Sequence, residues 1–405
     1  MKPVLRRTLR VAGGILICVY AISCGIGTPD STIGPVPPAS NVVDVVVNGG
    51  PDGTSVNSLY TTVTICVPGS TTQCQTIDNI LVDTGSYGLR LLAQVLTLTL
   101  PVAPALPSNN ALVECTVFLD GYSWGPVAAV DLTIASEKAG SLPVQIIGDA
   151  RYPTVPADCS SAGANTPEDS VAAFHANGVL GIGAFVLDCP ACAVNTIPAT
   201  YYACTSTACT NTAVALASQV QNPVHLFAAD NNGTIITLPA VGSGGAASLT
   251  GSLIFGIDTQ ANNQSGSQTI LALQTSGTNV GGLTTVFNGQ ALTQSFFDSG
   301  SNGNFFDDST IALCPSNLTP FYCPTSTVTR TATLQGATGT TNLVTFFVAD
   351  ASSIGAAITA FPNLAGTTSV ANSFDWGLPF YYGRRVATAI EGFTTSAGSG
   401  PYVAF

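Results

Sequence analysis

Two short stretches that share one pattern decide the fold. Residues 76–86 read TIDNILVDTGS and residues 292–301 read LTQSFFDSGS, so each is a strand-like apolar run that ends in Asp-(Thr/Ser)-Gly-Ser. A further glycine follows each motif, at Gly88 and Gly303. One such triplet is also an ordinary turn sequence. Two copies, 215 positions apart and each after an apolar run, indicate an internal repeat.

The repeat predicts a specific chemistry if it brings Asp83 and Asp298 together. Two neighbouring carboxylates cannot both ionise cheaply, so the pair would share one proton. The ionised member can act as a general base on a water, while the protonated member polarises a scissile carbonyl. This chemistry needs no metal, cofactor or histidine, and we expect none at the site.

With these motifs the chain resembles the pepsin-like aspartic peptidases, and the resemblance covers most of residues 58–405. Residues 60–65 (YTTVTI) are similar to the strand before the family's first active-site loop, and residues 177–183 (NGVLGIG) to its first hydrophobic-hydrophobic-Gly element. Residues 250–258 (TGSLIFGID) look like the interlobe strand, and residues 374–381 (FDWGLPFY) like the second hydrophobic-Gly element with its helix. The resemblance implies an all-β, bilobal pepsin-like aspartic protease fold with pseudo-twofold lobes and an interlobe cleft.

The resemblance also implies roles for the residues of both motifs. Asp83 and Asp298 would be the catalytic pair, which Gly85 and Gly300 allow the backbone to approach closely. The hydroxyl groups would orient the pair: Thr84 and Ser299 by locking the two loops together, Ser86 and Ser301 by bonding to the aspartates.

The chain departs from the family where a hairpin flap bearing a tyrosine covers the cleft. The corresponding residues 114–125 read ECTVFLDGYSWG, in which Phe118 falls nearest the flap position and Tyr122 and Trp124 are the polar aromatics nearby. These two could face the cleft or could be simple hairpin aromatics. Arg90 replaces the tryptophan that partners the flap tyrosine, and could pair with the dyad, with a substrate carboxylate or with a structural carboxylate.

Charge excludes whole classes of function. The chain has 10 Lys and Arg against 22 Asp and Glu, a formal net charge of −12. Such an acidic surface repels phosphate backbones, so we expect no nucleic-acid binding. His175 and His225 are the only histidines, which argues against a multi-histidine metal site.

Residues 1–23 are predicted to be an export signal. A positive region (residues 2–10) precedes an apolar stretch (residues 11–22) that is too short to span a bilayer. The small residues before Cys24 resemble a bacterial lipoprotein signal, in which Cys24 would be lipidated and residues 24–41 would form a flexible tether. The alternative is an ordinary signal peptide and a secreted protein. Either way we expect export, and with the lipid a place in the bacterial cell envelope.

The cysteines fit an exported protein. Without Cys18 in the signal and Cys24 at the lipid, ten of the twelve remain, enough for up to five disulfides. The pairs 66/74, 204/209 and 314/323 are close enough in sequence to bridge hairpins or loops. Residues 189–192 (CPAC) have the C-x-x-C spacing, for which we favour a structural disulfide over a redox or zinc role.

Together these observations predict one function, and two alternatives remain open. We expect an N-terminal lobe over residues 42–258, a C-terminal lobe over residues 259–405, and a membrane-anchored, monomeric aspartic endopeptidase that hydrolyses peptides or unfolded proteins. The first alternative is a catalytically silent pepsin-like envelope lipoprotein that binds a peptide, glycan or protein partner. The second is an adhesive β-rich surface protein in which both motifs are turns, and it predicts no twofold relation between Asp83 and Asp298.

Overall fold

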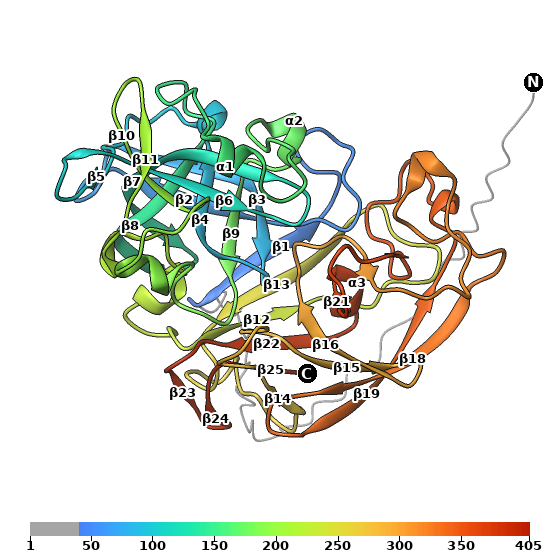
Figure 1. Cartoon of the computed structure of the whole chain (residues 1–405). Helices are drawn as coiled ribbons and strands as arrows, with labels where there is room; N and C mark the ends of the chain where they lie inside the picture. Colours follow the sequence, from blue (N-terminus) through green and yellow to red (C-terminus); the bar gives the residue numbers. More distant parts are fainter. Residues whose placement is uncertain (1–39) are drawn as a thin grey trace, which may run out of the picture. The chain divides into compact units, whose positions relative to one another are not determined.

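The computed structural model of the chain describes residues 40–405, and this part is almost entirely β (Figure 1). Its α-helices are single turns, α1 (Ala157–Ser160), α2 (Val171–Phe174) and α3 (Leu378–Tyr381). Further single 3-10 turns lie at Ala93–Val95, Pro190–Ala193, Leu216–Ser218, Pro223–Leu226, Ser316–Leu318 and Ala351–Ser353. The abundance of Val, Thr, Gly and Pro explains this balance, because these residues favour strands and turns over helices.

The strands follow one another along the whole described part. The first are β1 (Val42–Val47), β2 (Leu59–Cys66), β3 (Cys74–Asp83), β4 (Tyr87–Leu92), β5 (Pro104–Ala105), β6 (Asn110–Val117), β7 (Tyr122–Ile134), β8 (Glu137–Ile147), β9 (Gly178–Ile182), β10 (Tyr201–Cys204), β11 (Cys209–Asn211), β12 (Gly233–Thr237) and β13 (Leu249–Phe255). The others are β14 (Ile270–Ala272), β15 (Leu283–Phe287), β16 (Gln290–Phe297), β17 (Asn304–Phe305), β18 (Val328–Gln335), β19 (Thr341–Val348), β20 (Ala365–Gly366), β21 (Asp375–Trp376), β22 (Arg385–Ala389), β23 (Thr394–Thr395), β24 (Gly398–Ser399) and β25 (Tyr402–Ala404).

Hydrogen bonds join these strands into two main sheets. The 16-stranded sheet has the order β11-β10-β6-β7-β8-β4-β9-β3-β2-β1-β13-β12-β22-β25-β14, with β5 beside β6. The seven-stranded sheet has the order β19-β18-β15-β16-β21-β17-β20. Figure 1 shows two lobes, one coloured blue to green from the first half of the chain and one coloured orange to red from the second. The expected all-β, bilobal fold is therefore confirmed.

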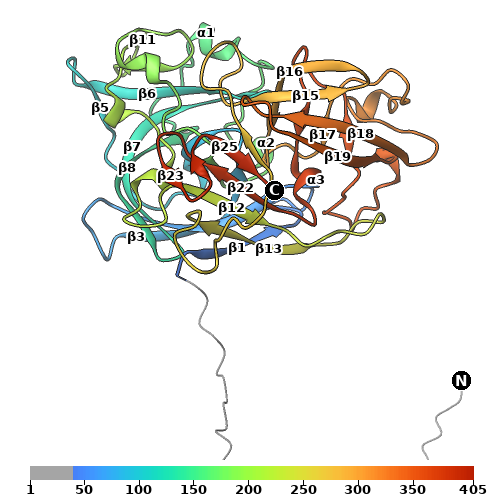
Figure 2. The same cartoon turned by 90° about the horizontal axis from the view of Figure 1, so that it is seen from below.

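The end of the chain connects the lobes. In the large sheet β22 lies next to β12, with Ile235 opposite Ala387, and β25 lies next to β22, with Ala387 opposite Ala404 (Figure 2). β12 in turn pairs with β13, and β13 with β1. A sheet that both halves of the chain build thus lies beneath the two lobes. The lobe limits at residues 258 and 259 stay a prediction.

The same strand arrangement surrounds each Asp motif. β9 runs parallel to β3, with Asp83 opposite Gly181, and antiparallel to β4, which leaves the motif. In the second half β21 runs parallel to β16 and antiparallel to β17, which leaves the second motif. In each half, therefore, a third strand bridges the strands that enter and leave the motif. This is the internal repeat that the sequence predicted.

Aromatic packing holds β21 in place. The buried ring of Phe374 stacks between Phe306 and Trp376, at centroid distances of 4.6 and 3.9 Å, and Phe346 packs edge-on against it at 5.4 Å. Such contacts contribute beyond the burial of area alone. They fix the segment around Asp375 next to the loop that carries Asp298.

Five disulfides form, as the cysteine count predicted. They join Cys66 to Cys74, Cys115 to Cys159, Cys189 to Cys192, Cys204 to Cys209, and Cys314 to Cys323. Disulfides at this density are typical of proteins outside the cytoplasm, in the extracellular space or the cell envelope.

The expected export signal (residues 1–23), Cys24 and nearly all of the tether lie outside the described residues. Within residues 40–405, no helix combines the length and the apolar character that crossing a bilayer requires.

Candidate active site

The two Asp motifs meet in space and are tied together by reciprocal hydrogen bonds. The backbone N–H of Ser299 donates to Thr84 Oγ1 (2.9 Å), and the backbone N–H of Thr84 donates to Ser299 Oγ (3.1 Å). Ser299 Oγ in turn donates to the carbonyl of Val82 (2.8 Å). Both hydroxyl side chains are buried, so water does not compete for these bonds. The loops therefore form one rigid unit that carries both aspartates.

Glycine is required in each loop because the opposite aspartate lies against it. A Cβ atom at Gly85 would lie 2.7 Å from Asp298 Cγ, and one at Gly300 would lie 3.0 Å from Asp83 Cγ. The backbone N–H of Gly85 donates to Asp83 Oδ1 and that of Gly300 donates to Asp298 Oδ1, both at 2.7 Å. The glycines thus permit the close approach and also orient the carboxyl groups.

A serine holds the second oxygen of each aspartate. Ser86 Oγ donates to Asp83 Oδ2, and Ser301 Oγ donates to Asp298 Oδ2 at 2.8 Å. The structure thus brings together all eight residues expected at the dyad. Their catalytic roles stay predictions.

The carboxyl groups of Asp83 and Asp298 lie side by side, with the Oδ1 atom of each 3.0 Å from the Cβ position of Gly300, and this alters the titration of Asp298. Burial raises the pKa of Asp298 well above its usual range, and the charge of Asp83 and the hydrogen bond with it raise it further. The bonds from Ser301 and Gly300 offset only part of this increase. Asp298 therefore keeps its proton to a higher pH than a free carboxyl group does. A pair that holds one proton can supply both a base and an acid.

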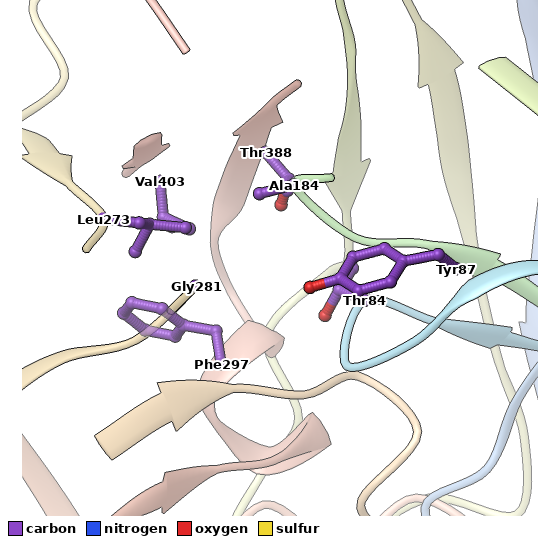
Figure 3. A pocket seen from close by; sticks show the side chains of 8 residues that line it. All are labelled: Thr84, Tyr87, Ala184, Leu273, Gly281, Phe297, Thr388 and Val403. Carbon is purple, nitrogen blue, oxygen red and sulfur yellow. The ribbon is translucent and has the colours of Figure 1, made fainter. Parts of the chain in front are cut away.

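A small pocket borders the dyad loops (Figure 3). Its volume of ≈ 20 Å³ is enough for about one water molecule. Both halves of the chain and the shared sheet contribute to its wall, through Thr84, Tyr87, Ala184, Leu273, Gly281, Phe297, Thr388 and Val403. In Figure 3 the Tyr87 hydroxyl points into this space. The site can therefore hold a water at the junction of the lobes.

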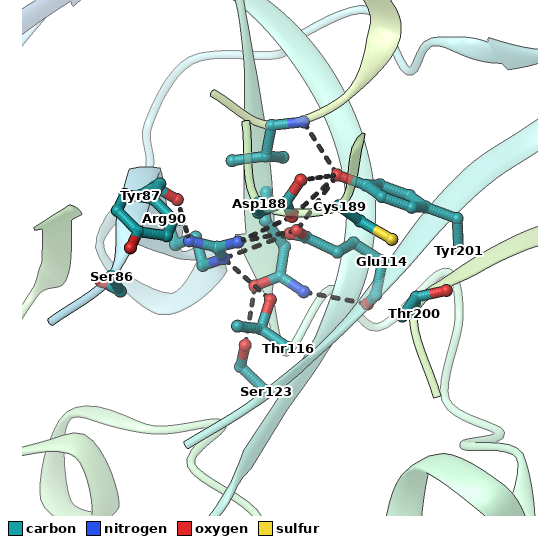
Figure 4. Close-up of polar contacts among 12 residues, drawn as sticks. Ser86, Tyr87, Arg90, Glu114, Thr116, Ser123, Asp188, Cys189, Thr200 and Tyr201 are labelled. Atoms are coloured by element: carbon teal, nitrogen blue, oxygen red, sulfur yellow. Dashed lines mark hydrogen bonds and ion pairs between the residues drawn. The ribbon is translucent and has the colours of Figure 1, made fainter. Parts of the chain in front are cut away.

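Arg90 lies inside the first lobe, where it pairs with structural carboxylates. Its side chain is 1% exposed, and Nη2 lies 2.7 Å from Glu114 Oε1 and 3.3 Å from Asp188 Oδ2 (Figure 4). Nε donates to Thr116 Oγ1 at 2.8 Å, and Nη1 donates to the carbonyl of Tyr87 at 2.7 Å. Of the alternatives left open for Arg90, the structure thus shows the structural ion pair. The bond to Tyr87 also braces the strand that leaves the Asp83 motif.

The aromatic residues of the expected flap lie in and on the first lobe. Trp124 is 5% exposed, packs edge-on against Tyr202, and donates its Nε1–H to the carbonyl of Tyr152 (2.9 Å). Tyr122 is buried in the same cluster. Phe118, at the turn between β6 and β7, packs its ring against Phe174 of α2. These contacts correspond to hairpin aromatics rather than to groups that face a cleft.

Two further residues contact the dyad loops, and the sequence motifs did not predict these contacts. The Tyr381 hydroxyl shares a hydrogen bond with Thr84 Oγ1 at 2.9 Å. The buried carboxyl group of Asp375 contacts Ser301 Oγ at 2.6 Å. Both belong to residues 374–381 (FDWGLPFY), where Asp375 is a charged residue within an apolar run. That interruption is the one feature of the sequence that could have indicated a functional residue here.

One group of metal-ligating residue types comes together within residues 40–405, namely Cys314, Cys323 and Asp350. The two cysteines are joined in a disulfide, so they offer no thiolate to a metal.

Comparison with known proteins gives a family but no function. The model of a family described as "Protein of unknown function (DUF3443)" matches residues 37–405. No curated protein matches the sequence. Among solved structures the chain is similar to the aspartic proteinase from Irpex lacteus, with 12% identity and a TM-score of 0.48 over 90% of this chain and 96% of that one. The fold described above rests on the strand pairing and not on this similarity.

Proposed function

The chain belongs to the DUF3443 family, and we propose that it is an exported aspartic endopeptidase. The single observation that supports this activity best is the contact between Asp83 and Asp298, held by the reciprocal bonds of Thr84 and Ser299. This arrangement needs both motifs in their complete form. It also argues against an adhesive protein in which the motifs are independent turns.

In the proposed reaction the pair activates one water molecule. The ionised carboxylate takes a proton from the water, whose oxygen attacks the carbonyl carbon of the peptide bond. The protonated carboxyl group, for which the raised pKa favours Asp298, donates a hydrogen bond to the carbonyl oxygen. No covalent intermediate forms, and the two residues exchange roles as the leaving amine takes up a proton. The reaction requires no metal or cofactor.

We propose that the protein works as a monomer in the bacterial cell envelope, anchored through a lipid on Cys24. The five disulfides and the pattern of residues 1–24 support export. The expected substrates are peptides and unfolded proteins, because the proposed reaction attacks the carbonyl carbon of a peptide bond. Recovery of the protein in the soluble fraction of the cells that make it would contradict the anchor.

A catalytically silent binding protein is the second candidate function. The observation that favours it is the hairpin between β6 and β7, whose aromatic residues pack on the first lobe. A cleft without a covering flap excludes water from the substrate less well, and this reduces catalysis more than binding. In that case the same cleft would hold a peptide, a glycan or a protein partner.

Cleavage of an unfolded protein substrate between pH 3 and pH 7 distinguishes the two candidates. We expect cleavage by the wild type and its loss, by at least a thousandfold on the order of other single catalytic deletions, in both D83N and D298N. The matched control is D44N, which alters an exposed aspartate of β1 and should cleave normally. A folded, oxidised wild type that cleaves nothing in this range overturns the peptidase proposal. Cleavage that survives in D83N or D298N does so as well.

A further inference from the structure

A third carboxyl group is connected to the aspartate pair. Asp375, in β21, is 2% exposed, and its Oδ2 lies 2.6 Å from Ser301 Oγ. The same Ser301 Oγ lies 2.8 Å from Asp298 Oδ2. The first half of the chain has no counterpart, because the position equivalent to Asp375 in the strand pairing is Val179. The feature therefore belongs to the second motif alone.

The number of protons on Ser301 decides how these bonds can form. A serine hydroxyl carries one proton, so Ser301 can donate to one of the two carboxyl oxygens but not to both. The other contact must be donated by a carboxyl group that is protonated on Oδ2. Either Asp375 or Asp298 therefore carries a proton on the oxygen that faces Ser301.

The surroundings of Asp375 favour the neutral form of this residue. Its Oδ1 has no hydrogen-bond partner within residues 40–405, and no Lys, Arg or His of this part pairs with it. The titratable groups around it are Asp298 and Asp83 on the dyad loops and Tyr381 on α3, none of which is a cation. An ionised carboxylate here would lose its hydration without compensation.

The electrostatic effects agree with the hydrogen-bond geometry. Burial raises the pKa of Asp375 well above its usual range, and the charge of Asp298 raises it further. The bond with Ser301 offsets only part of this increase.

We propose that Asp375 is a positioning residue that stays neutral, donates its proton to Ser301 Oγ, and so turns the Ser301 proton toward Asp298 Oδ2. Oδ2 of Asp298 then accepts the hydrogen bond of Ser301, and the proton that the dyad shares stays on Oδ1 of Asp298. The Oδ1 atoms of Asp83 and Asp298 both lie 3.0 Å from the Cβ position of Gly300, on the side where the two carboxyl groups meet. The proton is thus held between the catalytic groups. The inference rests on the proposed function, and it adds Asp375 as a residue that determines where the proton shared by Asp83 and Asp298 lies.

The neutrality of Asp375 can be measured without any activity. An unfolded aspartate loses its proton near its ordinary pKa of about 3.9, whereas the folded one would keep it to higher pH. The wild type therefore loses stability as pH rises above about 4, and D375N, which keeps an N–H donor but does not titrate, is spared this loss. We expect the melting temperature of D375N, relative to the wild type, to increase as pH rises above 4, up to the pH at which the folded Asp375 loses its proton.

D308N is the matched control for this measurement. Burial raises the pKa of Asp308, but bonds from Thr310 and Arg330 outweigh it and lower the pKa below its usual value. The ionised form of Asp308 thus stabilises the fold, so D308N should lose melting temperature relative to the wild type above pH 4. Parallel curves for D375N and the wild type from pH 4 to pH 8 would overturn the proposal.

The effect on the dyad is measured by the pH profile of cleavage. In D375L the Ser301 hydroxyl is free to turn away, so the carboxylate of Asp298 loses a hydrogen bond. We expect the basic limb of kcat/KM, which reports the loss of the Asp298 proton, to move up by about one pH unit and kcat to fall with little change in KM. D375N, which can still donate to Ser301, should restore the limb to its wild-type position. A merely structural role would lower kcat at every pH without moving the limb.

The two proposals fail in different ways. If the wild type cleaves nothing, the peptidase proposal fails, while the melting curves still decide whether Asp375 is neutral. If the wild type cleaves and the basic limb of D375L stays at its wild-type position, the role of Asp375 is overturned and the peptidase proposal stands.

Discussion

At the scale of the residue, Arg90 illustrates what a buried charge requires. Its guanidinium donates hydrogen bonds to Glu114, Thr116, Asp188 and the carbonyl of Tyr87 inside the first lobe (Figure 4). Burial and the charge of Glu114 raise the pKa of Asp188 well above its usual range, and Arg90 counteracts this only in part. One cation thus satisfies a cluster of acidic groups that could not be buried alone.

Removal of this cation should be costly. We expect R90M to lower the free energy of unfolding by about 3–5 kcal/mol, because it leaves the buried Glu114 without a cation. The double variant R90M/E114Q should recover part of the loss, since it removes the unpaired charge of Glu114 and leaves only that of Asp188. The measurement is urea unfolding at pH 7, with the slope checked for two-state behaviour.

An exposed arginine provides the comparison for R90M. Arg151 pairs with Asp149 at the surface, with its side chain 55% exposed. R151M should cost less than about 1 kcal/mol, because surface ion pairs contribute little. A loss in R90M no larger than that in R151M would show that the buried pair is not what stabilises this region.

At the scale of the element, the hairpin of β6 and β7 depends on a pair of acidic groups. Its turn is closed by the Phe118 N–H, which donates to the Gly121 carbonyl at 2.8 Å. Next to the turn, Asp120 and the mostly buried Glu168 share a hydrogen bond between carboxyl groups. Burial, the charge of Asp120 and this bond raise the pKa of Glu168 to about 8. At neutral pH Glu168 therefore keeps its proton, and its hydrogen bond with Asp120 stabilises the tip of the hairpin.

The hairpin should therefore open more easily in alkali. The folded pKa of Glu168 lies above its unfolded value, so its stabilising effect is complete below about pH 4.5 and is lost as pH rises through 8. Between pH 6 and pH 9 we expect the hydrogen-exchange protection of residues 118–122 to fall by about tenfold, after correction for intrinsic exchange rates. E168Q, which cannot ionise, should show no such fall. An equal fall in both proteins would contradict this role of Glu168.

At the scale of the whole molecule, acidic groups with shifted pKa values determine how the stability of the fold changes with pH. Acidic groups with raised pKa values are Glu137, Glu168, Asp188, Asp298 and Asp375. Each of them stabilises the fold less as pH rises through its folded pKa. Groups with lowered pKa values are Asp52, Asp149, Asp158, Asp258 and Asp308, and each loses its contribution as pH falls below about 4.

The protein should accordingly be most stable in mild acid. We expect the melting temperature to be highest near pH 4 to 5 and lower at pH 8, where the net charge of −12 also adds self-repulsion. Sodium chloride at about 0.5 M should raise the melting temperature more at pH 8 than at pH 4.5, because salt screens that repulsion. A stability maximum at pH 7 or above would refute this account.

The sequence by itself determined the features that depend on neighbouring residues. The paired Asp motifs, the strands that lead into them and the disulfides between nearby cysteines such as Cys66 and Cys74 could be predicted, because apolar alternation and turn chemistry are local. The repeat then predicted that Asp83 and Asp298 would meet, since two copies of one unit pack in a related way.

Tertiary structure alone decided the contacts between distant residues. It placed Arg90 on Glu114 and Asp188, joined Cys115 to Cys159, and set Asp375 beside Ser301. No local pattern encodes such pairs, because many polar partners are compatible with one strand and only the packing of the core selects among them. Asp375 shows this most plainly: in the sequence it is a charge that interrupts an apolar run, and in the fold it is a neutral acid that the aspartate pair can use.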